Sequence, residues 1–277
     1  DLLAHHFIRD RAEQALLLAY MPDERDDGDS LLISLSAGLL RNCVEVKESI
    51  VISNGRYRSI ICRDRECCSP AGSAMPQIED SQFAVEHVIA GIPMPFADIS
   101  ELVGSIAADE QSLSRSWYHE VDAYSIDEES PDLAALRRDG VEVMELLLDE
   151  FRIGRGPTDR RLVARMIGRM SDVQVRDYAL GIHSEDTFDL YFMMWRELLK
   201  MAPAGFVAPI ACIVAAMAYE NGDGALAQKA LDRAFSDDEQ YPLASLLRRV
   251  FNAGWPPQSF SQMRAELHPK VIASIFE

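Results

Sequence analysis

The chain has 277 residues, a length between one large domain and two ordinary ones. Hydrophobic residues make up 48% and charged residues 26%, as in an ordinary globular protein, and no apolar run reaches the roughly 18 residues that a bilayer span needs. The net charge of −18 repels phosphate backbones, so we expect neither a membrane nor a nucleic acid as the partner.

Residues 1–105 are predicted to form an α/β unit that contains a β-hairpin. The run QALLLAY, residues 14–20, is apolar and is followed by an acidic turn, which indicates a buried strand. Residues 30–42 repeat leucine at the spacing of an amphipathic helix. Two β-branched runs then flank Asn54-Gly55, a pair that supplies the positive φ angles of a type I′ hairpin turn. The chain opens without Met, so we expect this unit to lack residues at its N-terminus.

Three of the five cysteines, Cys62, Cys67 and Cys68, follow the hairpin within seven residues. An odd number of cysteines without an export signal favours reduced thiols and a cytoplasmic location. The side chains of adjacent residues tend to diverge, and the charges between the cysteines nearly cancel. We therefore favour a packed corner in which the three thiols are buried.

Two alternatives for the cysteines remain open. A structural zinc site at Cys62, Cys67 and Cys68 needs a fourth ligand, which must come from a histidine or from residues before Asp1; the histidine candidates are His5, His6 and His87. A redox pair or a thiol nucleophile needs a lowered pKa, which nearby arginines favour and the interleaved acidic residues oppose. We therefore expect no cofactor, with zinc as the open alternative.

Residues 106–132 are predicted to form an acidic linker. Residues 77–150 carry 18 Asp and Glu against 3 Lys and Arg, whereas residues 151–277 carry 15 against 15. Because the segment from Ile106 to Asp132 has few apolar residues to offset the entropy of ordering, we expect it to be the most mobile part of the acidic region.

Residues 133–277 are predicted to form a helical domain. Apolar residues recur there at three- and four-residue spacing. Around Gly222-Asp223-Gly224, small residues on both sides favour a close antiparallel helical hairpin, and Tyr241-Pro242 begins a third helix. The hairpin is similar to one tetratricopeptide-like unit, although no second copy follows at a period of about 34 residues. Such a helical surface can hold a segment of a partner protein.

A helix beginning at Thr158 places Arg161, Arg165 and Arg169 four residues apart in a stripe. Such a stripe can bind an anion. The acidic region directly upstream favours a different role, in which the arginines pair with acidic helices of the same chain.

Several motifs together resemble one family. The hairpin ends in the pattern C-x-D-x-x-CC-x-P-x-G, and the chain continues with DVQVRDYALG, WRELLKMAP and NGDGALAQKALDRAFSDDEQYPLASLLRRVFNAGWPP. From Gln14 to Pro257 the chain is similar to an actinobacterial family, the domain of unknown function 4192 family. The resemblance implies a cytoplasmic bacterial protein and supplies no catalytic residues, because the family has no established activity. Its members usually carry a further N-terminal stretch.

Three classes of function follow. No phosphate-binding loop, zinc-protease motif or nucleophile elbow is present, so the leading hypothesis is a non-enzymatic interaction or scaffold protein with a protein partner. The alternatives are a metal- or thiol-dependent enzyme centred on Cys62, Cys67 and Cys68, and a nucleotide-binding α/β domain completed by residues before Asp1. The sequence predicts no oligomeric state.

Overall fold

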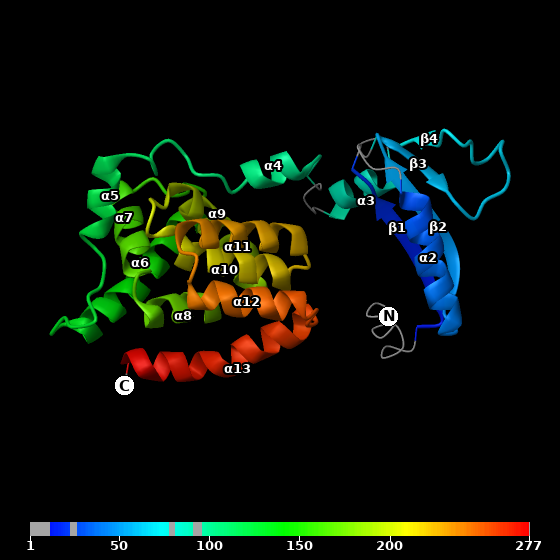
Figure 1. Ribbon diagram of the computed structural model, residues 1–277. Helices are drawn as coiled ribbons and strands as arrows, with labels where there is room; N and C mark the ends of the chain where they lie inside the picture. The colour runs from blue at the N-terminus through cyan, green and yellow to red at the C-terminus, as the bar shows by residue number, and fades with distance from the viewer. Residues whose placement is uncertain (1–11, 23–26, 78–80, 91–95, 277) are drawn as a thin grey trace. The chain divides into compact units, whose positions relative to one another are not determined.

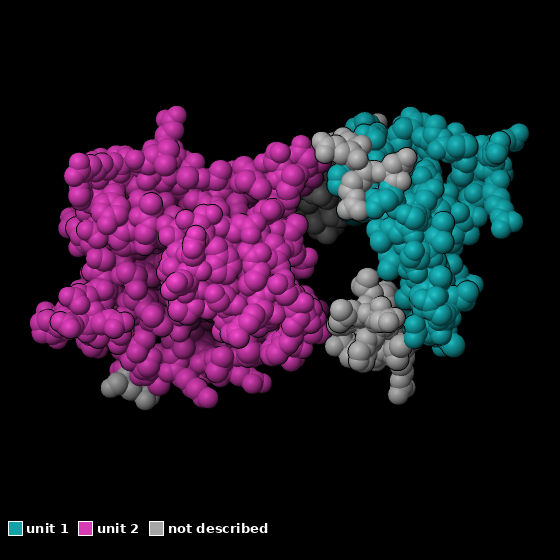
Figure 2. All heavy atoms as spheres, in the orientation of Figure 1, with its two compact units in different colours: residues 1–95 teal, residues 96–277 magenta. Residues whose placement is uncertain are grey.

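The computed structural model describes residues 12–22, 27–77, 81–90 and 96–276. The chain divides into two compact units, residues 1–95 and residues 96–277, which Figure 2 shows in different colours. Each unit has hydrophobic clusters of its own. The boundary lies at residue 95, ten positions before the one that the sequence indicated.

Unit 1 is built on a four-stranded sheet with strand order β1-β2-β3-β4 (Figure 1). The strands are β1 Gln14–Tyr20, β2 Glu45–Ser53, β3 Arg56–Ser59 and β4 Ser73–Ala74. Strands β1 and β2 run parallel, and helix α2, Gly28–Arg41, connects them. One face of the sheet is covered because Leu32 and Leu39 of α2 are buried against it. The predicted strand and helix are both present, but the strand is buried on one face only, since Leu16 and Leu18 are 59% and 48% exposed.

Strands β2 and β3 form the predicted hairpin. They pair antiparallel with Ser53 opposite Arg56, which leaves Asn54 and Gly55 as the two turn residues. Their φ angles are 52° and 65°, the left-handed values that a type I′ turn requires. After β4, helix α3 spans Gln82–Ala90, and its first turn is capped by the Ser81 hydroxyl, which accepts from the Ala84 amide at 3.1 Å. The predicted end of this helix at Gly91 lies outside the described residues.

Unit 2 is helical (Figure 1). Its elements are α4 Ile99–Gly104, α5 Arg115–Asp122, α6 Leu133–Arg152, α7 Arg160–Arg169, α8 Val173–Gly181, the 3-10 turn η2 Glu185–Thr187, α9 Phe188–Met201, α10 Val207–Glu220, α11 Gly224–Asp237, α12 Pro242–Asn252 and α13 Pro257–Phe276. Through residue 276 no strand follows Ser130, as predicted. Among the described residues, no helix combines the length and the apolar composition that crossing a bilayer requires.

Helix α10 is the centre of unit 2. Each of its residues from Val207 to Ala218 is buried, because the helix is apolar on all sides and α8, α9, α11, α12 and α13 pack around it. The predicted antiparallel hairpin of α10 and α11 is present and turns at Gly222, whose φ is 81°. At the other end, the Asp237 carboxylate of α11 accepts from the Val207 and Ala208 amides, each at 2.9 Å. Asp237 therefore caps the first turn of α10.

Residues 106–132 do not link two units, because they lie within unit 2. That this segment is the most mobile part of the acidic region stays a prediction. This segment contains α5, and Trp117 and Val121 of that helix are 0% exposed in the core of unit 2. The Trp117 indole also donates to the Met201 carbonyl at 2.6 Å. Ile106 and Ile126 are buried as well, whereas Leu113 and Tyr118 are exposed and most of the charged side chains face solvent. A low apolar content thus concealed a helix that packs into the core.

Candidate functional site

The three clustered cysteines converge. The Sγ atoms of Cys62, Cys67 and Cys68 all lie within 4.8 Å of one another, and those of Cys67 and Cys68 are 3.9 Å apart. Cys67 is exposed and the other two are half-buried, so the packed corner with buried thiols is wrong. The argument that adjacent side chains diverge fails here because the turn that carries them brings Cys67 and Cys68 back towards Cys62.

Asp64 shapes that turn. Its carboxylate accepts from the Glu66 amide at 2.9 Å and the Cys67 amide at 3.5 Å. Its carbonyl accepts from the Cys68 amide at 2.7 Å. A single aspartate thereby fixes the backbone of both adjacent cysteines, since an Asp side chain readily satisfies amides two and three residues on.

The loop is also fixed at both ends. The Ser59 hydroxyl at the end of β3 accepts from the Cys62 amide at 3.0 Å and donates to Glu48 at 2.6 Å. On the far side, Arg56 donates to the carbonyls of Ala71 and Gly72 at 2.7 and 2.5 Å. The cysteines are therefore presented by a loop anchored to the sheet rather than by a free one.

No fourth ligand joins the three thiols among the described residues. His5 and His6, two of the candidates, lie outside the described residues, as does the side chain of His87. The cluster is thus a three-sulfur arrangement with one side open to solvent.

The arginine stripe lies on α7 as the sequence placed it, although Asp159 rather than Thr158 caps this helix. Arg169 donates to Asp139 of α6 at 2.7 Å, and Arg165 binds the same carboxylate. Arg161 is exposed and donates to the Tyr124 hydroxyl at 3.0 Å. Two of the three arginines therefore have an acidic partner within the chain.

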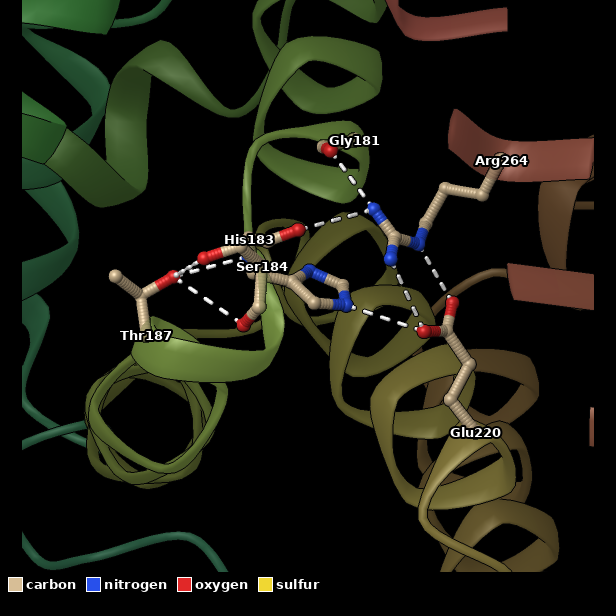
Figure 3. A network of polar contacts seen from close by, with 6 residues as sticks. All are labelled: Gly181, His183, Ser184, Thr187, Glu220 and Arg264. Carbon is tan, nitrogen blue, oxygen red and sulfur yellow. Dashed lines mark hydrogen bonds and ion pairs between the residues drawn. The ribbon is translucent and has the colours of Figure 1, made fainter. Parts of the chain in front are cut away.

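A buried polar network, which the sequence did not indicate, lies in unit 2 (Figure 3). Arg264 of α13 donates to Glu220 of α10 through Nε at 2.7 Å and Nη2 at 3.2 Å. Glu220 also contacts His183 Nε2 at 3.2 Å. Burial raises the pKa of Glu220, but the hydrogen bonds from His183 and Arg264 outweigh it and hold the pKa below the usual 4.5. Glu220 is therefore a buried carboxylate kept ionised by its partners.

The network borders an open groove of about 340 Å³. His268 of α13 packs nearby with its ring centroid 5.2 Å from that of Tyr178. Burial, and next the positive charge of Arg264, lower the pKa of His268. No nucleophile is hydrogen-bonded to His183 or His268 within the described part of the chain, so this geometry indicates a structural link between helices.

A second groove of unit 2 is mostly apolar and encloses about 490 Å³. One wall carries Leu113, which is 80% exposed, and Tyr118, which is 37% exposed. Pro203 of the α9–α10 loop, Val207 of α10 and Arg233 of α11 also line it. We call this the Leu113 groove. Its lining also includes the charged side chains of Arg115 and Asp237.

The chain thus combines a small α/β unit, in which two of the strands are parallel, with a larger helical unit. The family model for Domain of unknown function (DUF4192) matches residues 1–258, so the chain belongs to this family. No curated protein and no solved structure matches the sequence.

Proposed function

We propose that the protein is a non-enzymatic interaction module, and that unit 2 holds a segment of a partner protein in the Leu113 groove. The observation that carries this proposal is the exposure of Leu113 beside an apolar hollow. A leucine that is 80% exposed at such a place is available for burial by a partner.

Charge defines the chemistry of the partner segment. Unit 2 carries 30 Asp and Glu against 18 Lys and Arg in residues 96–277. At the groove itself the charges are mixed, because Arg115, Arg233 and Asp237 line it and Asp109 and Asp237 act electrostatically on Arg233. We therefore expect a segment whose large apolar side chain enters the groove and whose flanking basic residues face the acidic remainder of unit 2. The five free thiols support a reducing, cytoplasmic setting for the interaction.

To test the proposal, a photocrosslinking amino acid replaces Leu113 in the full chain and is crosslinked to any bound partner. Crosslinked peptides are mapped by mass spectrometry, and the mapped segment is synthesised for affinity measurements. Leu113→Glu is expected to weaken binding by roughly tenfold or more, because it places a charge where an apolar side chain docks. The matched control is Leu246→Glu on α12, where the leucine is 48% exposed and outside the groove.

The proposal is supported if the mapped segment is basic and apolar and only the Leu113 variant binds weakly. Equal binding by both variants contradicts it, as does a crosslinked segment without an apolar residue.

One observation weighs against a nucleotide-binding alternative in unit 1. The stretch between β1 and α2, where phosphates bind in such folds, contains four acidic residues and one arginine. Asp29 in the first turn of α2 is already bound by Arg58, at 2.5 and 3.0 Å. A phosphate at this helix end meets negative charge.

A further inference from the structure

We propose that Cys62, Cys67 and Cys68 form a binding site for one soft, thiophilic metal ion, Zn(II) or Cu(I). The proposal concerns unit 1 and does not depend on the function proposed for unit 2. It begins from the convergence of three sulfur atoms within 4.8 Å of one another on a surface loop.

The sulfur spacing fits a metal centre. With metal–sulfur bonds of about 2.3 Å, two sulfurs on the same ion lie about 3.8 Å apart at tetrahedral angles and about 4.0 Å apart at trigonal angles. Cys67 and Cys68 are already at 3.9 Å. The other pairs need to shorten by about 1 Å at most, from 4.8 Å to about 3.8 Å. A side-chain rotation covers this change without moving the backbone.

The spacing does not fit a disulfide. A disulfide needs sulfurs about 2.05 Å apart, and each of the three thiols is free. The loop also gives the site a fixed frame, because Asp64 holds the amides of Cys67 and Cys68 while Ser59 holds that of Cys62. Ligands that are oriented before the metal arrives lose less entropy on binding it.

The ligand set selects the kind of metal. Thiolate sulfur prefers soft ions such as Cu(I) and Zn(II) over Mg²⁺ or Ca²⁺. Cu(I) is satisfied by the three sulfurs alone, whereas Zn(II) takes a fourth ligand, which water can supply on the open side beside exposed Cys67. Each thiol that coordinates the ion releases its proton to solvent. Arg63 and Arg65 are exposed in the same loop, but exposed Asp64 and Glu66 balance them, so the loop itself adds no net charge to that of the sulfurs.

The experiment uses the reduced full chain, stripped of metal with a chelator under anaerobic conditions. Zn(II) and Cu(I) are added in separate titrations against a chromophoric competitor. One equivalent of metal per chain is expected for at least one of the two ions. Thiol alkylation followed by mass spectrometry is then expected to show protection of Cys62, Cys67 and Cys68 by the metal. Exposed Cys43 provides an internal control that stays reactive with and without metal.

Variants test the ligands one at a time. Cys67→Ser and Cys68→Ser are each expected to weaken binding by at least roughly tenfold, and Cys43→Ser to leave it unchanged. Because the loop is at the surface, the far-UV circular dichroism of all three variants should match that of the unaltered chain. Failure of both ions to bind overturns the proposal, as does binding that protects none of the three thiols or that is equally strong in all variants.

Discussion

Arg264 and Glu220 form a two-pronged ion pair between α13 and the end of α10, with Nε–Oε1 and Nη2–Oε2 distances of 2.7 and 3.2 Å. The two side chains are only 11% and 7% exposed. The third nitrogen of Arg264, Nη1, donates to the Gly181 carbonyl at the end of α8 at 2.8 Å. One guanidinium therefore joins three helices of unit 2.

Replacing Arg264 with Gln should destabilise unit 2 by about 3–5 kcal/mol, because it leaves the buried Glu220 carboxylate without its cation. Urea unfolding followed by circular dichroism measures the loss. The control is Arg152→Gln, which removes an exposed pair with Asp149 and should cost about 0–1 kcal/mol. Equal losses in the two variants contradict a stabilising role for the Arg264–Glu220 pair.

The same pair predicts a pH dependence. The pKa of Glu220 is lower in the folded protein than its usual 4.5. At acidic pH the folded chain therefore binds fewer protons at Glu220 than the unfolded chain does. The stability that this group contributes is therefore fully present above pH 4.5 and is lost as the pH falls through the lowered pKa. Urea midpoints of the unaltered chain and of Glu220→Gln should differ at neutral pH and approach each other below pH 4.5. A constant difference over this range contradicts the prediction.

Gly168 lets α7 approach the end of α5. A Cβ atom added at this position would clash with the Val121 carbonyl oxygen and would lie 2.8 Å from the Tyr124 Cβ. Gly168→Ala should cost about 1–3 kcal/mol, because backbone has to move to make room. Gly104→Ala in α4 meets nothing within 4 Å and should be neutral or stabilising. Thermal unfolding of the two variants compares them, and a stable Gly168→Ala protein would count against this packing.

Asp139 is shared by Arg165 and Arg169, and the Arg169 side chain is only 10% exposed. Asp139→Asn should cost about 1.5–3 kcal/mol, since charged hydrogen bonds to two arginines are lost. Asp149→Asn, at an aspartate that is 65% exposed, should change the free energy of unfolding by about 1 kcal/mol or less. If Asp139→Asn unfolds at the same urea concentration as the unaltered chain, the arginines do not depend on this carboxylate.

Local patterns were sufficient to predict most of the fold. The Asn54-Gly55 hairpin and the α10–α11 hairpin follow from turn chemistry and apolar spacing, which act over a few residues. The acidic segment around Trp117 was misjudged because its order comes from contacts with α9 and other distant helices. The average composition of a segment does not reveal that one tryptophan in it is buried.

The sites were harder to predict for the same reason. Spacing identified the three cysteines, but their convergence depends on the hydrogen bonds of Asp64, which the sequence does not reveal. His183, Glu220 and Arg264 were missed because up to 81 positions separate them along the chain and each alone is an ordinary polar residue. A local indication of this network was His183, which lies in a short polar stretch after the apolar end of α8.

Asp237 has a consequence for the integrity of the α10–α11 pair. The covalent turn at Gly222 joins the helices at one end, and the Asp237 carboxylate joins them non-covalently at the other. A protease that cuts the turn should therefore produce two fragments that stay associated. The nicked protein should elute as a single particle under native conditions and separate into two chains only in denaturant.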